Sequence, residues 1–303
     1  MAAGAGKMIL IGPQGPRPRQ WWAPSRIFVY AVLLISAAFF LFPLYVVVVT
    51  SLKGLDEIRY SSIFALPMRP TTEGWVEAWD TACTGLHCEG LKVGFWNSMK
   101  ITVPSVMLSI FAGSLCGYAM ALWRFHGAEF FFTAMLFCIF IPQQTILYPL
   151  AQMMGYFRLM GTLPAAIMIN TVLGLPFMTL LFRNGFAALP TDLFRAARVD
   201  GAGFWRIYAQ VLMPLAMPTV GVAVVLQVTY IWGDYLFTTL FAGMHHLPMT
   251  MQYHNIVGSM YGVAEYNVQM AATILTGAVP LIVYFSCGRL FARGIAVGVA
   301  PPR

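Results

Sequence analysis

Six apolar runs divide this chain into stretches that suit lipid and stretches that suit water. A helix that crosses a bilayer needs about 20 predominantly apolar residues. The runs cover residues 27–50, 101–123, 130–152, 163–183, 218–241 and 269–291. Because 59% of the residues are hydrophobic and only 10% are charged, the composition excludes a soluble globular domain. The sequence predicts an all-α integral membrane protein with six transmembrane helices.

The positions of Lys and Arg predict which side of the membrane is cytoplasmic. With six spans, both termini and the loops after the second and fourth spans lie on one side. That side carries 12 of the 18 basic residues and only three acidic ones. Cytoplasmic segments are enriched in Lys and Arg, so we expect both termini to be cytoplasmic. The net charge of +7 therefore indicates topology, and nucleic-acid binding is not expected.

The segment 187–218 separates two apolar runs and carries five charged side chains. Each charge at the bilayer centre would cost about 2.5–3.5 kcal/mol, so the segment must leave the membrane. Thr191 is expected to cap a first helix, and Asp200-Gly201 is expected to end it, because Gly adopts the left-handed conformation without strain. A second helix is predicted from about Gly203 until Pro214 and Pro218 close it. A passive cytoplasmic linker is the alternative interpretation.

The same segment resembles the cytoplasmic coupling loop of ABC importer permeases. The family pattern is Glu-Ala-Ala, three residues, Gly, nine residues, then Ile, any residue and Leu-Pro. The matching positions here are Arg195-Ala196-Ala197, Gly201, Val211 and Met213-Pro214. Arg195 replaces the usual Glu and reverses its charge, while Val211 and Met213 replace Ile and Leu. The resemblance implies that the ATPase-coupling residues are Arg195, Ala196, Ala197, Asp200, Gly201 and Ala202.

The resemblance covers the chain from about residue 95 to its end, and it implies the type I ABC importer permease fold. Together with the apolar runs and the distribution of charge, it predicts a cytoplasmic tail 1–26, a first transmembrane helix 27–50, a periplasmic loop 51–94, an ABC permease core domain 95–293 with the coupling loop 187–218, and a cytoplasmic tail 294–303. The implied partners are a second homologous permease subunit, a dimer of ATPase subunits and a periplasmic sugar-binding protein, in the bacterial inner membrane.

A separate subunit is expected to hydrolyse ATP. This chain has no Gly-rich phosphate-binding loop with a Lys, so we expect no cofactor here and expect ATP and Mg to be bound by the partner ATPase. No Ser/His/Asp set or metal-binding set converges in the sequence, so a membrane enzyme is disfavoured. His245, His246 and His254 do not share a metal-ligand spacing, and no metal site is expected.

Short motifs connect the chain with carbohydrate permeases. Trp232-Gly233-Asp234-Tyr235 resembles the Trp-Asn-Glu-Phe/Tyr stretch of that group, and Leu247-Pro248-Met249-Thr250 resembles its Leu-Thr element. The segment 81–91, followed by Phe95-Trp96-Asn97-Ser98, is similar to monosaccharide permeases of the glucose/mannose group. The resemblance implies import of a sugar, with a monosaccharide such as glucose or mannose expected.

Polar side chains in the third, fourth and fifth spans are candidates for the substrate pathway. Prolines at 142 and 149 are expected to break the third span. Such a break leaves backbone N–H and C=O groups without helical partners, and these are tolerated in a membrane only where they face protein or a watery cavity. In the fifth span, polar residues at 227, 230, 234 and 238 are expected on one helical face. The candidates are Gln143, Gln144, Tyr148, Asn170, Gln227, Tyr230 and Asp234. Polar contacts between helices, or packing against a partner permease, would explain them equally well.

Cys83 and Cys88 lie in the outward loop, where an oxidising periplasm favours a disulfide. Cys116, Cys138 and Cys287 lie within spans and are expected to be small apolar fillers.

A proton- or sodium-coupled secondary carrier of small polar solutes is the alternative function. Such carriers usually have internal repeats and several intramembrane acids. This chain has one intramembrane carboxylate, Asp234, and no detectable repeat.

Overall fold

The computed structural model describes residues 24–84, 88–123, 125–258 and 264–299, and these residues form helices joined by short loops. The longer helices are α1 (Pro24–Ser51), α4 (Lys92–Tyr118), α5 (Ala128–Phe140), α6 (Gln143–Tyr156), α7 (Leu163–Ala187), α8 (Thr191–Val199), α11 (Met217–Gly233), α13 (Met249–Val257) and α14 (Tyr266–Val299). The shorter elements are α2 (Leu55–Tyr60), α3 (Glu73–Val76), α9 (Phe204–Arg206), α10 (Met213–Leu215), α12 (Leu236–Ala242), the π-helical turns η1 (Glu77–Thr81), η2 (Ala119–Trp123) and η3 (Ile207–Leu212), and the 3-10 turn η4 (Met244–His246).

The chain forms two compact units, Met1–Val46 and Val47–Arg303. In the first unit, the described residues belong to α1, which contains Pro43. Its large apolar side chains are exposed, with Phe39 and Phe40 each 73% accessible. Such a surface is unsuited to water and is typical of a helix surrounded by lipid.

Four helical segments in the described residues are long and apolar enough to cross a membrane: Ile27–Ser51, Lys92–Trp123, Leu163–Ala187 and Tyr266–Gly288. Two bent pairs also have the required composition. Ala128–Phe140 and Gln143–Tyr156 meet at 104°, and Phe204–Leu215 and Met217–Gly233 meet at 79°. Counting each pair as one span gives up to six. The third predicted span is therefore a sharply broken one, with its break at Pro142, whereas Pro149 lies inside α6.

Small residues allow α4 and α7 to form the closest long-helix pair of the second unit. A Cβ atom added to Gly113 would lie 2.5 Å from the Met178 Cβ, and one added to Gly117 would lie 2.7 Å from the Arg183 backbone nitrogen. Both distances are shorter than van der Waals contact, so these positions require glycine. In lipid, close backbone approach of this kind supplies the packing that holds helices together.

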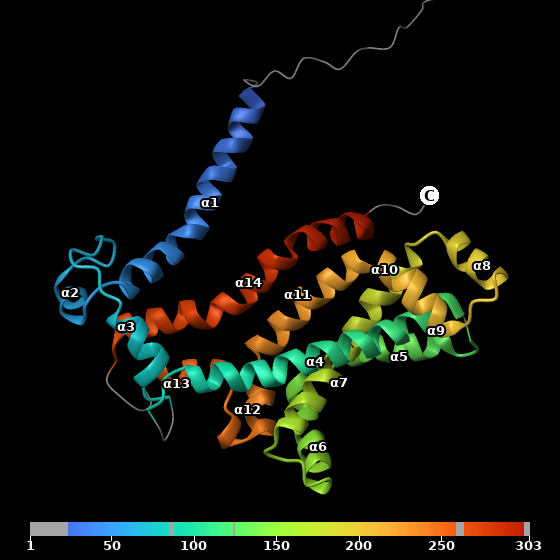
Figure 1. Cartoon of the computed structure of the whole chain (residues 1–303). Coiled ribbons are helices and arrows are strands. Elements are labelled where there is room, and N and C mark those ends of the chain that lie inside the picture. Colours follow the sequence, from blue (N-terminus) through green and yellow to red (C-terminus); the bar gives the residue numbers. More distant parts are fainter. Residues whose placement is uncertain (1–23, 85–87, 124, 259–263, 300–303) are drawn as a thin grey trace, which may run out of the picture. The chain divides into compact units, whose positions relative to one another are not determined.

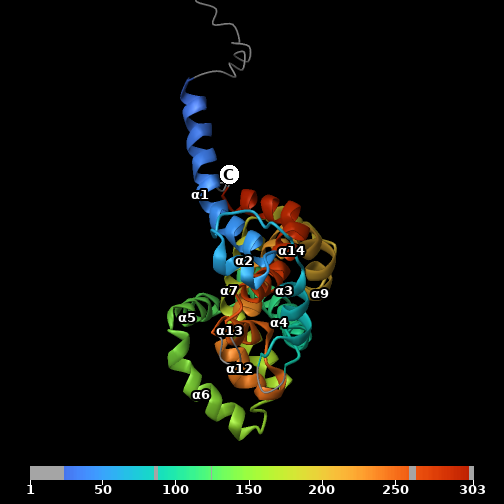
Figure 2. The same cartoon turned by 90° about the vertical axis from the view of Figure 1, so that its left-hand side faces the viewer.

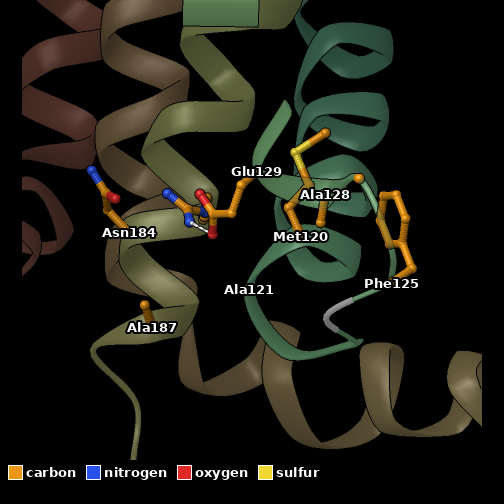
Figure 3. Close-up of a pocket in the computed structure, with 9 residues that line it drawn as sticks. Met120, Ala121, Phe125, Ala128, Glu129, Asn184 and Ala187 are labelled. Atoms are coloured by element: carbon orange, nitrogen blue, oxygen red, sulfur yellow. Dashed lines mark hydrogen bonds and ion pairs between the residues drawn. The ribbon is translucent and has the colours of Figure 1, made fainter. Parts of the chain in front are cut away.

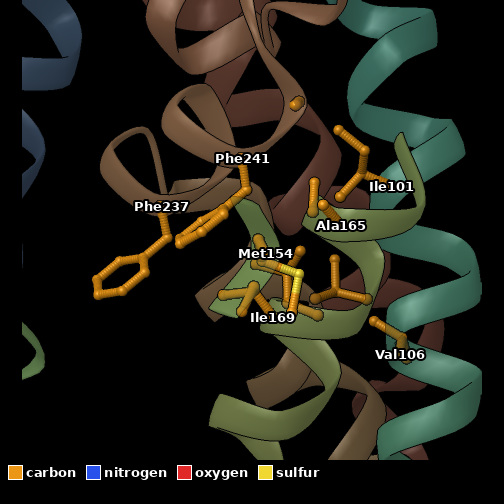
Figure 4. Close-up of a cluster of buried hydrophobic side chains, with 11 residues drawn as sticks. Ile101, Val106, Met154, Ala165, Ile169, Phe237 and Phe241 are labelled. Atoms are coloured by element: carbon orange, nitrogen blue, oxygen red, sulfur yellow. The ribbon is translucent and has the colours of Figure 1, made fainter. Parts of the chain in front are cut away.

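Three clusters of buried side chains hold the second unit together. One joins α4, α6, α7, α11 and α12, and Figure 4 shows Ile101, Met154, Ile169 and Phe241 of this cluster converging from these helices. A second joins α4 and α7 to the hairpin α8–η3. The third joins η1, α13 and α14 around Trp232, whose indole Nε1 donates to the Thr276 carbonyl at 2.9 Å.

The hairpin and the segment 243–257 lie at opposite ends of the second unit. Figure 1 shows α8 beyond one end of α4 and α13 at the other end. Figure 2, seen from the side, shows α5 and α6 along one side of the unit. At the α13 end, the Gly94 nitrogen donates to the Gln252 Oε1 at 2.8 Å, and the Met249 nitrogen donates to the Ser98 Oγ at 2.9 Å.

Candidate functional site

The hairpin 188–216 is built around a left-handed turn at Gly201. Gly201 has φ of 76°. The Asp200 nitrogen donates to the Ala196 carbonyl, and the Ala202 nitrogen donates to the Ala197 carbonyl, each at 3.0 Å. These two bonds satisfy carbonyls that would otherwise be unpaired at the end of α8. The predicted turn at Asp200-Gly201 is therefore confirmed, and the second helix begins at Phe204.

The start of α8 differs from the sequence prediction. Thr191 is the first residue of the helix, Pro190 occupies the capping position, and no side chain caps the helix there. The physical reason is that Pro190 has ψ of 120° and so turns the chain one residue earlier than expected. Asp192 lies in the first turn, as predicted, where the helix dipole favours a negative charge.

The outer face of α8 is free in this chain. Phe194 is its one buried residue, while Val199 is 88% accessible. Arg195 contacts Asp192 at 3.7 Å, and their side chains are 76% and 90% accessible. The structure places Arg195, Ala196 and Ala197 in α8 and places Asp200, Gly201 and Ala202 in the turn that follows. Of these six residues, Ala197 and Ala202 are partly buried against the second cluster and the other four are exposed.

An aromatic cluster connects the hairpin to the ends of α4 and α7. Tyr118 is fully buried, with ring centroids 4.5 Å from Phe204 and 5.7 Å from Tyr208. Its hydroxyl donates to the Phe204 carbonyl at 3.3 Å, and the Ser114 and Tyr208 hydroxyls lie 2.7 Å apart. The hairpin is therefore joined to α4 by packed rings and hydrogen bonds as well as by the chain that connects them.

Trp123 extends this cluster to α8. Its ring centroid lies 6.1 Å from that of Phe194 and 5.3 Å from that of Phe204. The Arg198 guanidinium lies 5.2 Å from the Trp123 ring centroid, a cation–π contact that fixes the last turn of α8. Sequence reasoning missed the roles of Tyr118 and Trp123. The available signal was the recurrence of aromatic residues in the hairpin, which require an apolar surface to pack against.

The structure brings two of the predicted pathway residues into direct contact. The Gln143 Nε2 of α6 donates to the Tyr230 hydroxyl of α11 at 2.6 Å. Gln144 is exposed, and Tyr148, which is 69% accessible, accepts from the Gln152 Nε2 at 2.8 Å. The start of α6 is therefore polar and accessible next to Tyr230.

Asn170 and Gln227 lie inside the second unit and not on an accessible wall. Asn170 is 1% accessible, and its Nδ2 donates to the Thr238 Oγ1 at 3.1 Å. Gln227 is 2% accessible and packs so closely on Gly174 that a Cβ there would overlap its amide. These two side chains join α7 to α11 and α12, as expected for polar contacts between membrane helices.

Asp234 does not continue the helical face of Gln227 and Tyr230, so that prediction is wrong. Helix α11 ends at Gly233, and Asp234 has extended backbone angles. Its carboxylate accepts from the Phe237 nitrogen at 3.2 Å and from the Thr238 nitrogen at 2.7 Å. Backbone donors at the start of α12 thus stabilise the negative charge. The sequence pattern missed the break because Tyr235 and Leu236 suit a continuous helix.

Cys83 and Cys88 form a disulfide in the segment that precedes α4. Next to it, the Thr84 carbonyl accepts from the Asn255 Nδ2 at 2.6 Å, and Thr84 is 3% accessible. Thr84, next to Cys83, is therefore held on α13.

We expect mass spectrometry to show three alkylated thiols in the denatured, unreduced protein, because Cys116, Cys138 and Cys287 are free. Reduction before alkylation should raise the number to the five cysteines of the sequence. Five alkylations without reduction would show that Cys83 and Cys88 are unpaired. Cys83→Ser serves as the control, because it should expose one further thiol in the unreduced protein.

Glu77 of η1 lies close to Glu265, which precedes α14. Burial raises the pKa of Glu77, and the negative charge of Glu265 and a hydrogen bond between the two carboxyl groups raise this pKa further. An acid whose pKa is raised by folding stabilises the fold fully below its ordinary pKa, about 4.3 for glutamate. This contribution is lost as the pH rises through the raised pKa.

We therefore expect the stability of the wild type relative to Glu77→Gln to be greatest at about pH 4 and to fall as the pH rises toward 7. At neutral pH, Glu77→Gln should unfold at a higher temperature than the wild type, because it removes the repulsion. Asp80→Asn is the matched control: it breaks the 3.1 Å ion pair with Lys92 but leaves Glu77 and Glu265 in place. Identical pH profiles for the wild type and Glu77→Gln would contradict this assignment.

Comparisons with known proteins agree with this architecture. Residues 93–297 match the family described as binding-protein-dependent transport system inner membrane component. The chain is 33% identical to the osmoprotective compounds uptake permease protein GgtD of Synechocystis over 70% of this chain and 72% of that protein. It is 29% identical to the melibiose/raffinose/stachyose import permease protein MelC of Bacillus subtilis, over 90% and 95% of the two chains.

A solved structure shows the same fold. A chain from a crystal structure of a bacterial ABC transporter involved in the import of the acidic polysaccharide alginate superposes with a TM-score of 0.71 at 22% identity. The match covers 89% of this chain and 99% of that chain. The type I ABC importer permease fold expected from the hairpin pattern is thus confirmed. Because the family match spans most of its length, this chain belongs to the binding-protein-dependent transport system inner membrane components, the permease subunits of ABC importers.

Proposed function

We propose that this chain is the permease subunit of an ATP-driven importer that moves a sugar across the bacterial inner membrane. The observation that carries the proposal is the exposed helix α8, held by Phe194 and Trp123 on the cluster around Tyr118. A helix exposed on one side and rigidly anchored on the other suits docking into a second protein. Rigid-body movement of that protein then becomes movement of α4 and α7.

The partners in this proposal are a dimer of ATPase subunits that bind ATP and Mg, a second homologous permease subunit and a periplasmic sugar-binding protein. The ATPase dimer contacts the hairpin 188–216, and this chain contributes no hydrolysis. Both termini face the cytoplasm. The apolar side chains of α5 that remain exposed, such as Phe137 and Phe140 at 68% and 80%, face lipid or the second permease.

The sugar assignment is supported by the names of relatives and by the accessible polar side chains of α6. Matched proteins include permeases named for xylose/arabinose, diacetylchitobiose and alpha-glucoside. Gln143, Gln144 and Tyr148 offer hydrogen-bonding groups and a ring face, which suit a hydroxylated ring that has apolar faces. Asp234 is excluded from this set because its carboxylate is used by backbone donors. We favour a monosaccharide of the glucose/mannose kind.

The alternative, a proton- or sodium-coupled carrier, loses its main candidate residue. Asp234 would be the coupling carboxylate in such a carrier. It instead accepts hydrogen bonds from two backbone nitrogens and from the Thr238 hydroxyl at 2.8 Å. Binding and releasing a proton or sodium ion at this carboxylate would break the cap of α12.

The test is uptake by the assembled complex in proteoliposomes that contain ATP. We expect glucose uptake that requires the binding protein, stops when the ATPase phosphate-loop Lys is replaced, and persists when a protonophore collapses the proton gradient. Competition by mannose but not by a disaccharide would support the monosaccharide assignment. Uptake that survives loss of ATP hydrolysis but stops with the protonophore would establish the carrier instead.

A further inference from the structure

A pocket of about 550 Å³ lies beside the segment that follows α4, the start of α5 and the end of α7. Its lining includes no residue of α8 and none of the candidate pathway residues. Figure 3 shows Glu129 between the end of α7, marked by Asn184 and Ala187, and the segment that carries Met120 and Phe125. The lining residues are Met120, Ala121, Phe125, Gly127, Ala128, Glu129, Arg183, Asn184 and Ala187.

The pocket lies at the ends of candidate membrane spans, where lipid headgroups are expected. It is lined by the π-helical end of the span Lys92–Trp123, by the start of α5 and by the last turn of Leu163–Ala187. The water-exposed hairpin begins directly after Ala187. The distribution of Lys and Arg places this end at the cytoplasmic leaflet. An occupant of the pocket would therefore meet water on one side and the ends of lipid chains on the other.

One cation and one anion face each other in the pocket. The Arg183 Nη2 donates to the Glu129 Oε1 at 2.7 Å, and their side chains are 23% and 78% accessible. The guanidinium also lies 3.7 Å from the Phe132 ring centroid, which fixes it in place. Guanidinium has five N–H donors, and among the described residues Glu129 is its one hydrogen-bond partner. Because the Glu129 carboxylate is largely exposed, water weakens this ion pair. A ligand that supplies a new partner for each group can therefore separate the two side chains at small cost.

The rest of the lining suits an amphiphile. Met120, Phe125 and three alanines give the pocket an apolar wall. Next to Glu129, Phe130 and Phe131 of α5 are 73% and 55% accessible, which extends the apolar surface along the helix away from the pocket. The N-terminus of α5 also lies at the pocket, because Gly127, Ala128 and Glu129 line it, and helix N-termini favour phosphate groups.

We propose that this pocket binds the headgroup of one zwitterionic phospholipid, phosphatidylethanolamine, from the cytoplasmic leaflet. The phosphate binds Arg183 and the start of α5, the primary ammonium donates to Glu129, and the acyl chains follow the exposed phenylalanines of α5. A choline headgroup has no N–H to donate to a carboxylate, and a glycerol headgroup has no cation to pair with it. The ion pair in the pocket thus selects ethanolamine over both. The lipid would stabilise the span ends beside the hairpin.

Native mass spectrometry of the purified full-length chain, titrated separately with phosphatidylethanolamine, phosphatidylcholine and phosphatidylglycerol, tests this proposal. We expect the wild type to retain one phosphatidylethanolamine in preference to the other two lipids. Glu129→Gln should remove the preference, and Arg183→Gln should lower retention of phosphatidylethanolamine by about tenfold, the loss expected for one hydrogen bond to a charged group. Arg206→Gln is the control, because Arg206 is exposed on the hairpin outside the pocket and should leave retention unchanged.

Among the lipid titrations, two results would overturn the proposal. One is equal retention of the three lipids by the wild type, and the other is wild-type selectivity in Glu129→Gln. Soluble phosphoethanolamine separates the headgroup from the lipid: it should not displace the bound lipid at millimolar concentration, and full displacement would show a soluble phosphate site instead. Since the Glu129 side chain is 78% accessible, Glu129→Gln keeps its fold even where Arg183→Gln does not. The result does not depend on transport or on the ATPase.

Discussion

Replacing Gly201 by Val is expected to lower ATP-driven uptake about tenfold or more, with normal insertion of the chain into the membrane. Gly201 has φ of 76°, and no atom lies within 4 Å of the place where a Cβ would be. The cost is therefore conformational and not steric. The left-handed conformation costs a residue other than glycine about 1–2 kcal/mol, and it costs a β-branched residue more. The turn after α8 would open, and the exposed face of the helix would lose its position.

The matched control for this change is Gly203→Val, two residues further along the same turn. Gly203 has φ of −78° and ψ of 175°, which any residue adopts, and its Cβ would also meet open space. Gly203 is the N-cap of α9, where Val is less favourable than Gly. Uptake by Gly203→Val should therefore fall less than uptake by Gly201→Val, because no left-handed strain is added. Equal uptake by Gly201→Val and the wild type would show that the turn conformation plays no part in coupling.

The second large effect is expected at Tyr118. Tyr118→Ala should lower the free energy of unfolding by about 3–5 kcal/mol, the usual cost of removing a buried aromatic ring. The ring is fully buried and packs against Phe186, Phe204 and Tyr208. Denaturant unfolding of the purified protein measures the loss. Any assembled complex of this variant should hydrolyse ATP with less uptake per ATP, because the hairpin no longer moves α4.

Tyr118→Phe separates ring packing from hydrogen bonding. It keeps the ring and removes only the hydroxyl that donates to the Phe204 carbonyl at 3.3 Å. We expect a loss of about 1 kcal/mol or less and near-normal coupling. If Tyr118→Ala unfolded at the same denaturant concentration as the wild type, the aromatic cluster would not be the anchor of the hairpin.

Local chemistry allowed much of the hairpin to be predicted from the sequence. The cost of charges in lipid places the segment outside the membrane, and Asp200-Gly201 sets the turn. The start of α8 was misplaced by one residue because Pro190 rather than Thr191 takes the capping position. Turns and helix ends depend on residues that are neighbours in the chain, so they can be predicted without a structure.

Contacts between distant segments could not be predicted in the same way. Nothing around Tyr118 in the sequence indicates that it packs under Phe204, since the pairing depends on how α4 crosses the hairpin. Asp234 shows the same limit: a period of polar residues suggested one helical face, but the carboxylate caps α12 after a break. The Arg183 and Glu129 ion pair likewise joins two helices that only the fold brings together.

A photo-crosslinking residue at Ala196, on the exposed face of α8, tests the docking of the hairpin most directly. In native membranes that contain the whole transporter, we predict capture of the nucleotide-hydrolysing subunit from this position. We predict none from Met68, which is 85% accessible and lies in the loop expected on the opposite side of the membrane. Failure to capture that subunit from Ala196, while the complex still imports its substrate, would contradict the proposal that α8 connects this chain to its ATPase.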